Sequence, residues 1–371
     1  MADVMDLQLQ SLPLDSWHRA RGGRMVPFAG YEMPVQYPMG VMQEHIWTRT
    51  KAGLFDVSHM GQVILRGADA AAKLETLVPV DVIALKEGRQ RYAMFTNDDG
   101  GILDDLMVAN RGDHLFVVVN AACKEADVAH MQAHMDGVEV VADRALLALQ
   151  GPLAEKVLMA YADVSSMKFM DVAIIDSAFG PLWISRSGYS GEDGLEISVM
   201  NDQATAFARA LLADADCAPI GLGARDSLRL EAGLCLYGSD IDTTTSPIEA
   251  DLAWAIQKSR RSGARAGGFP GAARILDELE NGAARKRVGI LPEGRAPMRA
   301  HTPLYAAETG GDPIGEVTSG AFGPSIERPM SMGYIPAELA QDGATIWGEV
   351  RGKRLPAKVT ALPFRPSTYK R

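Results

Sequence analysis

The feature that most constrains the fold is the close spacing of glycine and proline, which divides the chain into short segments. The sequence has 37 glycines and 20 prolines in 371 residues, and no long heptad or fixed-period repeat runs through it. Runs such as 62–66 and 114–119 are rich in β-branched residues and predict strands. Helical patterns lie between the strands in irregular order, for example at 202–213, where Asn201 can cap the first turn. This order favours an α+β fold over a doubly wound sheet.

The length of the chain predicts more than one domain, because a single core rarely grows this large. Residues 258–271 are rich in Arg, Ser, Gly and Ala, which is typical of a linker. After them, 288–290, 315–318 and 344–350 have the pattern of short strands separated by Gly and Pro turns. We therefore expect a small all-β domain at the C-terminal end.

The composition excludes several classes of protein. A net charge of −10 argues against a nucleic-acid binder, which needs a broad basic surface. No stretch approaches the roughly 20 apolar residues that cross a bilayer. The first residues lack the basic and apolar regions of a secretory signal, so we expect a cytoplasmic protein. Cys123, Cys217 and Cys235 show no paired spacing, which fits unpaired thiols in a reducing compartment.

Common signatures of phosphate, dinucleotide, metal and nucleophile sites are missing. Asp226 stands where the dinucleotide fingerprint that begins at Gly221 needs its third glycine, and Ser190 is out of register for a nucleophile elbow. His130 and His134 have the spacing of zinc ligands, but no Glu follows His130, so a solvated helix face is favoured. An enzyme with this sequence is expected to use positioning and proton transfer, without a metal, a flavin or NAD.

Two adjacent carboxylates, Asp104 and Asp105, follow a strong turn sequence at 97–101 and lie among apolar residues. Successive side chains of a strand point to opposite faces, so the two aspartates have different surroundings. On a packed face a carboxylate is poorly solvated and its pKa rises, which makes it a candidate acid or base. The alternative is that both aspartates cap the turn or pair with arginines, and the residues alone leave this choice open.

Two further segments have the character of a binding site. The glycines of 187–197 let the backbone approach a ligand, and Glu196 in a predicted strand is either an acceptor for a heterocycle or an exposed side chain. A short helix predicted at 224–233 puts Arg225 and Arg229 on one face. Like charges at this spacing repel mildly, so we expect an anion to hold them. That anion is either an internal carboxylate or the carboxylate of a ligand.

Taken together, these segments resemble the glycine-cleavage T-protein family of aminomethyltransferases. The resemblance is carried by Gly-Gly-Ile-Leu-Asp-Asp-Leu at 100–106 and by further stretches in order along the chain: 24–34, 53–60, 188–196, 223–238, 296–301 and 315–320. It implies three domains arranged like a clover leaf around a central folate pocket. The implied parts are a discontinuous first domain (1–57 and 147–250), a second domain (58–146), a helical and basic linker (251–284) and a C-terminal barrel or jelly roll (285–371).

The family passes the carbon of an aminomethyl group, held on the lipoyl arm of the H-protein, to tetrahydrofolate. The products are 5,10-methylenetetrahydrofolate, ammonia and the dihydrolipoyl H-protein. The resemblance therefore implies tetrahydrofolate as co-substrate and lipoylated H-protein as partner. It also implies a functional link to the P-protein and the L-protein, a monomer or weak dimer, and a bacterial cytoplasm or a processed organellar chain.

The resemblance also assigns site residues. The catalytic aspartate of the family falls on Asp105, which is expected to contact the folate nitrogen that accepts the carbon, while Asp104 is left with a structural role in the turn or a domain contact. The implied folate-pocket residues are Met60, Tyr92, Asn120, Tyr189, Glu196, Arg225 and Tyr369. Acceptors such as Glu196 suit the N–H donors of the pterin, and Arg225 suits the carboxylates of the glutamate tail.

Two departures from the family and two related functions stay open. Ser190 stands where many members have Thr, and the basic run 258–265 is either a flexible loop or a docking surface for an acidic H-protein or a polyglutamyl tail. Demethylating enzymes of the dimethylglycine or sarcosine type share the folate architecture but normally carry a flavin domain. Non-catalytic folate-binding relatives that assist iron–sulfur proteins are expected to lack the aspartate found here at 105.

Overall fold

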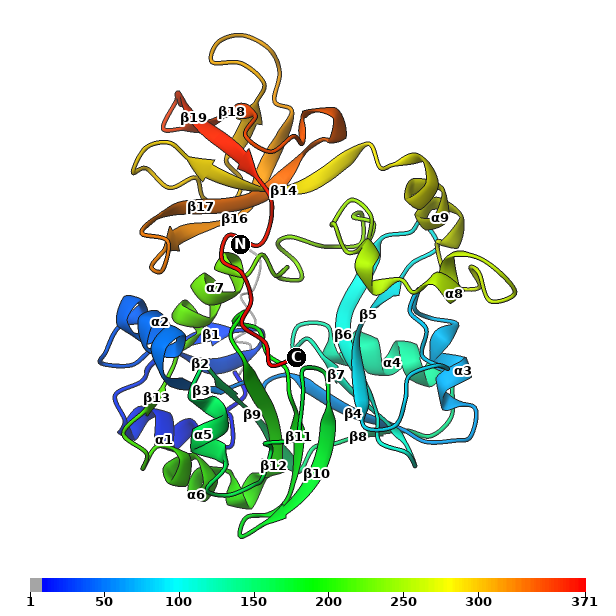
Figure 1. Cartoon of the computed structure of the whole chain (residues 1–371), viewed down its shortest axis with the longest axis vertical. Coiled ribbons are helices and arrows are strands. Elements are labelled where there is room, and N and C mark those ends of the chain that lie inside the picture. Colours follow the sequence, from blue (N-terminus) through cyan, green and yellow to red (C-terminus); the bar gives the residue numbers. More distant parts are fainter. Residues whose placement is uncertain (1–8) are drawn as a thin grey trace, which may run out of the picture.

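The computed structural model describes residues 9–371. The chain forms three lobes arranged like a clover leaf, with the C-terminal end returning to the first lobe (Figure 1). Strands and helices are mixed, and the third lobe is an all-β barrel, as the sequence predicts. Within the described part of the chain, no helix is long and apolar enough to span a membrane.

The first lobe is built on a six-stranded sheet in the order β10-β11-β12-β9-β3-β13. Its strands are β3 (Ala52–Asp56), β9 (Arg144–Gln150), β10 (Val172–Ser177), β11 (Gly180–Ser185), β12 (Gly194–Met200) and β13 (Cys217–Pro219). A hairpin of β1 (Arg24–Phe28) and β2 (Tyr31–Gln36) belongs to the same lobe. The helices of this lobe are α1 (Asp15–Ala20), α2 (Val41–Thr50), α5 (Ala154–Leu158), α6 (Asn201–Leu211) and α7 (Leu222–Glu231).

Helix α6 shows how the spacing of apolar residues builds the core of this lobe. Ala204, Phe207 and Ala208 are fully buried in it, as their positions on one helical face predict. The predicted cap is wrong, because Asn201 is the first residue of the helix and its side-chain amide donates to the carbonyl of Ala142 at 3.1 Å.

The second lobe holds a five-stranded sheet in the order β5-β6-β7-β4-β8. Its elements are β4 (Gly61–Leu65), α3 (Ala70–Glu75), β5 (Arg89–Thr96), β6 (Ile102–Asn110), β7 (Leu115–Val119), α4 (Lys124–His134) and β8 (Val138–Val140). Residues 144–146, assigned from the sequence to this domain, pair within the first sheet, because β9 already begins at Arg144.

The segment between the second lobe and the barrel contains η1 (Ala253–Ala255), α8 (Lys258–Arg261) and α9 (Ala272–Asn281). Two of its arginines are used internally. Arg260, only 4% exposed, pairs with Glu75 at 3.0 Å, and Arg265 pairs with Glu75 and with Asp81 at 2.9 Å each. These two arginines therefore fit neither a flexible loop nor a docking surface, because carboxylates of the second lobe already neutralise their charges.

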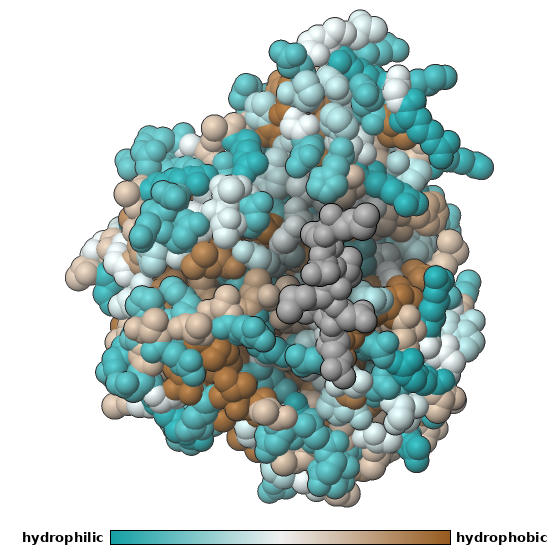
Figure 2. Space-filling view, turned by 180° about the vertical axis from the view of Figure 1, so that it is seen from behind, coloured by the Kyte–Doolittle hydropathy of each residue, from teal (hydrophilic) through white to brown (hydrophobic). Residues whose placement is uncertain are grey.

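The third lobe is a closed barrel in the order β14-β17-β16-β15-β18-β19, and β14 closes it by pairing with both β17 and β19. Its elements are β14 (Arg285–Pro292), β15 (Pro303–Tyr305), β16 (Gly315–Gly323), β17 (Arg328–Pro336), η2 (Ala337–Leu339), β18 (Thr345–Val350) and β19 (Lys353–Thr360). Val288 and Ile290 alternate into the core, which is the period-two pattern of a strand. Seen from behind, the outside of the barrel is largely hydrophilic (Figure 2).

Candidate functional site

A tight turn between β5 and β6 positions the paired aspartates. The side chain of Asn97 accepts a hydrogen bond from the N–H of Gly101 at 2.8 Å. A Cβ atom at Gly101 would lie 1.8 Å from the carbonyl oxygen of Thr243, so the turn requires glycine there. The resulting register puts Asp105 opposite Met94 in the neighbouring strand.

Asp105 is half-buried, and its carboxylate is held by a neutral donor, the amide of Asn120. Asn120 donates to its Oδ1 at 2.7 Å, and Tyr92 on β5 lies near enough to lower the pKa of the carboxyl group. Burial, and to a smaller extent the adjacent charge of Asp104, raise the pKa of Asp105 to about 7, against the lowering effect of Tyr92 and Asn120. Asp105 is therefore a carboxyl group that can gain or lose a proton near neutral pH.

Asp104 is fully buried, and its surroundings correct the expectation of a turn cap or an arginine partner. Asn120 donates to it twice, from the backbone N–H at 3.1 Å and from the side-chain amide at 2.9 Å. The same amide also bonds Asp105, so Asn120 bridges the two aspartates. A third carboxyl, Asp127 of α4, lies within hydrogen-bonding reach of Asp104. No motif in the sequence marks Asp127 as a site residue, although it lies four residues before the buried Met131 on one helical face.

Three other predicted residues come together beside α7. The guanidinium of Arg225 lies over the ring of Tyr189, 4.7 Å from its centroid, and Tyr189 belongs to a glycine-rich loop at 187–193. Glu196 on β12 accepts a hydrogen bond from Ser187 at 2.8 Å, and its charge acts on Arg225. Within residues 9–371, Arg225 has no hydrogen bond or ion pair to a carboxylate. Burial lowers the pKa of Arg225, because the buried cation is poorly solvated. An anion beside the guanidinium would therefore be bound favourably.

Arg229, one turn further along α7, has a different environment. It pairs with the buried Asp240 at 2.6 Å and with Asp226 at 2.9 Å, and it donates to Ser319 of the barrel at 2.8 Å. The internal carboxylate that the sequence left as one alternative therefore exists for Arg229. Helix α7 lies between the first lobe and the barrel (Figure 1), so this arginine joins the two.

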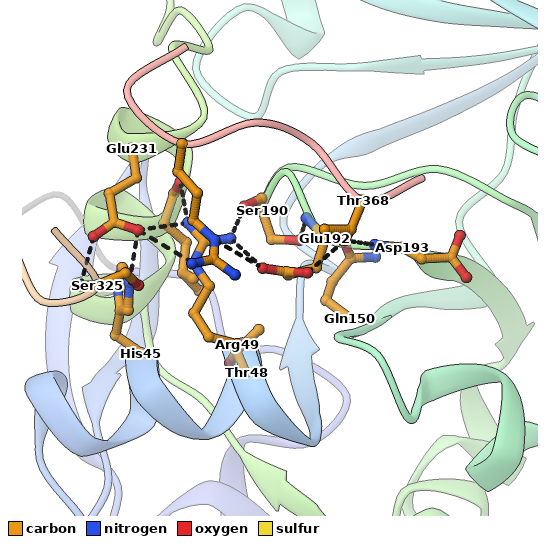
Figure 3. A network of polar contacts seen from close by, with 12 residues as sticks. His45, Thr48, Arg49, Gln150, Ser190, Glu192, Asp193, Glu231, Ser325 and Thr368 are labelled. Carbon is orange, nitrogen blue, oxygen red and sulfur yellow. Dashed lines mark hydrogen bonds and ion pairs between the residues drawn. The ribbon is translucent and has the colours of Figure 1, made fainter. Parts of the chain in front are cut away.

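A buried polar network fixes the glycine-rich loop (Figure 3). Arg49 of α2 donates to the carbonyl of Ser190 at 2.6 Å and pairs with Glu192 at 3.1 Å and with Glu231 at 2.8 Å. From the C-terminal tail, the hydroxyl of Thr368 donates to Glu192. The loop that carries Tyr189 is thus held between α2, α7 and the tail.

Tyr369 and Met60 have other neighbours in the structure. Tyr369 stacks on Phe169 with 4.0 Å between ring centroids, next to the point where the tail meets the glycine-rich loop. Met60 packs against the cluster that contains Leu228 of α7. It also lines a cavity of about 670 Å³ that none of the other predicted site residues lines.

One exposed aromatic residue near Asp105 was also missed. Trp254 is 62% exposed, and its ring centroid lies 5.4 Å from that of Tyr92. It lies within the segment 251–284, which is expected to be a linker, and no motif there marks it as a site residue. Among residues 9–371, no three His, Cys, Asp or Glu side chains come together as a possible metal site.

Comparison with known proteins gives consistent matches over almost the whole chain. Residues 14–260 match the family model described as the GCVT N-terminal domain, and residues 285–365 match the glycine cleavage T-protein C-terminal barrel domain. The mitochondrial aminomethyltransferase of Homo sapiens is 45% identical, over 97% of this chain and 91% of that protein. The protein of the same name from Dictyostelium discoideum is 41% identical, over 98% and 94%. The crystal structure of glycine cleavage system aminomethyltransferase T from Bartonella henselae superposes with a TM-score of 0.91 at 42% identity, covering 98% of this chain and 100% of that one.

Proposed function

The chain belongs to the glycine cleavage T-protein family and is an aminomethyltransferase, and we propose that Asp105 is the group that handles the proton in its transfer step. The reaction moves the carbon of the aminomethyl group on the lipoyl arm of H-protein to tetrahydrofolate. It yields 5,10-methylenetetrahydrofolate, ammonia and dihydrolipoyl H-protein. The sequence left demethylation and non-catalytic folate binding open as alternatives. The family match supports aminomethyl transfer instead.

The residues around Asp105 fit a folate. A guanidinium without a bonded carboxylate of the protein suits the carboxylates of the glutamate tail, and Arg225 has this property within residues 9–371. A carboxylate acceptor such as Glu196 suits the N–H donors of the pterin. The exposed ring of Trp254 beside Tyr92 offers an aromatic surface for the flat part of the molecule. Tetrahydrofolate, when bound, supplies the amine nitrogen that accepts the carbon.

Asp105 acts as a base on that nitrogen in our proposal. An amine that forms a new bond to carbon must lose a proton, and a carboxylate whose pKa is about 7 can take it up near neutral pH. Asn120 donates to the carboxylate and fixes its orientation, with Tyr92 beside it, which leaves the remaining lone pairs for the substrate. Its negative charge also favours the positive charge that develops on the carbon as ammonia leaves.

The other residues have binding roles in this proposal. Glu196 and Tyr189 hold the pterin and Arg225 holds the glutamate tail. Met60 and Tyr369 complete the edges of the pocket. The support is strongest for Arg225, because it faces Tyr189 and Glu196 together. It is weakest for Tyr369, which stacks on Phe169, and for Met60, which lines a different cavity.

We extend the proposal to partners and compartment. Lipoylated H-protein is the donor, the P-protein and the L-protein act in the same system, and the chain is a monomer or weak dimer. Its three cysteines are unpaired, which suits a reducing compartment. A bacterial cytoplasm and the interior of an organelle both meet this condition, and the relatives named above from human and Dictyostelium are mitochondrial proteins.

The near-neutral pKa of Asp105, together with its oriented hydrogen bonds, is the observation that carries the proposed role. The test is Asp105→Asn, assayed by release of ammonia from aminomethylated H-protein after tetrahydrofolate is added. We expect turnover to fall by about 10²–10⁴-fold while folate binding, followed by tryptophan fluorescence, is retained. Asp98→Asn in the exposed turn before β6 is the matched control. Near-normal turnover with normal folate binding in Asp105→Asn would refute the role.

A further inference from the structure

A second carboxyl pair lies behind Asp105. Asp104 of β6 is 0% exposed and Asp127 of α4 is 3% exposed, and the two carboxyl groups lie within hydrogen-bonding reach of each other. Within residues 9–371 no cation reaches either of them. Asp104 accepts hydrogen bonds from Asn120, and Oδ2 of Asp127 is buried without a donor.

This geometry allows only one charge on the pair. Two ionised carboxylates in contact, away from water and without a cation, repel each other strongly. A single proton removes the repulsion, because the protonated group donates its O–H to the ionised one. The backbone and side-chain N–H groups of Asn120 both point to Asp104, which stabilises the charge there. The proton therefore belongs on Asp127.

The neighbouring titratable groups leave this arrangement intact. The thiol of Cys123 and the hydroxyl of Tyr237 face the pair, and burial raises the pKa of both, so they stay neutral. Burial raises the pKa of Asp127 as well, and the charges of Asp104 and Asp105 act in the same direction. All the charges that act on Asp127 are thus negative.

We propose that Asp127 is a positioning residue for the transfer step: it carries the one proton of the Asp104–Asp127 pair and so keeps a single negative charge on Asp104, next to Asp105. This charge makes Asp105 a stronger base than an isolated carboxylate, and Asn120 links the two because its amide bonds both. The effect on catalysis rests on the proposed role of Asp105, whereas the shared proton does not.

The shared proton is tested first, without any assay of activity. At about pH 8.5, Asp105 is ionised, since its pKa is about 7. A protonated carboxyl group in the pair then gives an infrared C=O band at a higher wavenumber than the bands of carboxylates. We expect the difference spectrum between the folate-free enzyme and Asp127→Asn to show loss of one such band. The Asp105→Asn enzyme should keep the band at the same pH. An unchanged band in Asp127→Asn would overturn the proposal, even if Asp105 proves essential.

The effect on the reaction is tested by the pH dependence of kcat/KM. The asparagine side chain in Asp127→Asn has the shape of the protonated acid and can donate to Asp104. The negative charge on Asp104 is therefore kept, and the acid limb of the profile should stay in place. The double variant Asp104→Asn/Asp127→Asn removes the charge, and we expect its acid limb to move down by about one pH unit, a tenfold change in the acidity of Asp105. If Asp127→Asn shifts the limb as far as the double variant, or if neither shifts it, the positioning role is wrong. A change in folding alone would not move the limb.

Discussion

Arg225 and Arg229 lie four residues apart on α7, yet in the described residues only Arg229 is bound to a buried carboxylate, that of Asp240 at 2.6 Å. The guanidinium of Arg225 instead lies over the ring of Tyr189. Two arginines at this spacing predict an anion between or beside them. The fold supplies that anion for Arg229 from within, which leaves Arg225 for an anion from outside the protein.

Arg225→Gln should weaken folate binding without slowing the chemical step. A charge-assisted hydrogen bond contributes about 1.5–3 kcal/mol, so we expect KM for tetrahydrofolate to rise by roughly 10–100-fold while kcat changes little. Steady-state assays with saturating aminomethylated H-protein measure both values. An unchanged KM would show that another cation binds the glutamate tail.

Arg229→Gln should have the opposite signature. Removing this arginine leaves Asp240 buried with its charge uncompensated, so we expect the free energy of unfolding to fall by about 3–5 kcal/mol. Denaturant unfolding of the two variants side by side provides the comparison, because Arg225→Gln should be close to wild type in stability. Equal destabilisation by both substitutions would contradict the assignment of distinct roles.

Local sequence patterns were sufficient to predict the elements that carry the site. The turn at 97–101 followed by a strand, Glu196 within a strand, and the helix that ends before Gly233 are all present in the structure. Turn residues and apolar spacing act over a few neighbours, so each of these segments contains its own signal. Short strands between glycines likewise predict the all-β C-terminal domain, whereas its barrel form was implied by the family resemblance.

Partners distant in sequence could not be predicted in this way. Asp104 was expected at the turn or beside an arginine, yet it bonds Asn120 and lies beside Asp127, both of which lie on other elements. Arg260 was assigned to a linker, yet it pairs with Glu75, which is 185 residues away. A buried charge needs a partner, but which one depends on how the lobes pack.

The pH dependence of turnover should follow the titration of Asp105. Its pKa is about 7 in the folded enzyme, and the ionised form is the base. We therefore expect kcat/KM to rise about tenfold per pH unit below pH 7 and to level off above it. Residual activity of Asp105→Asn should lack this limb. A wild-type profile that is flat between about pH 5.5 and 7.5 would contradict the assignment.

The raised pKa of Asp105 also predicts that this carboxyl group lowers the stability of the fold at alkaline pH. Its pKa is 3.8 in a model peptide and about 7 in the folded protein. Between these values the unfolded chain releases the proton while the folded protein keeps it, so unfolding becomes more favourable as pH rises and the effect is complete above pH 7. Asp105→Asn does not titrate and keeps the hydrogen bond from Asn120. We expect its free energy of unfolding to exceed that of wild type by a margin that grows from pH 5 to pH 8, measured by denaturant unfolding. Asp98→Asn, in the exposed turn, should show no such growth. An equal margin at both pH values for Asp105→Asn would contradict the raised pKa of Asp105.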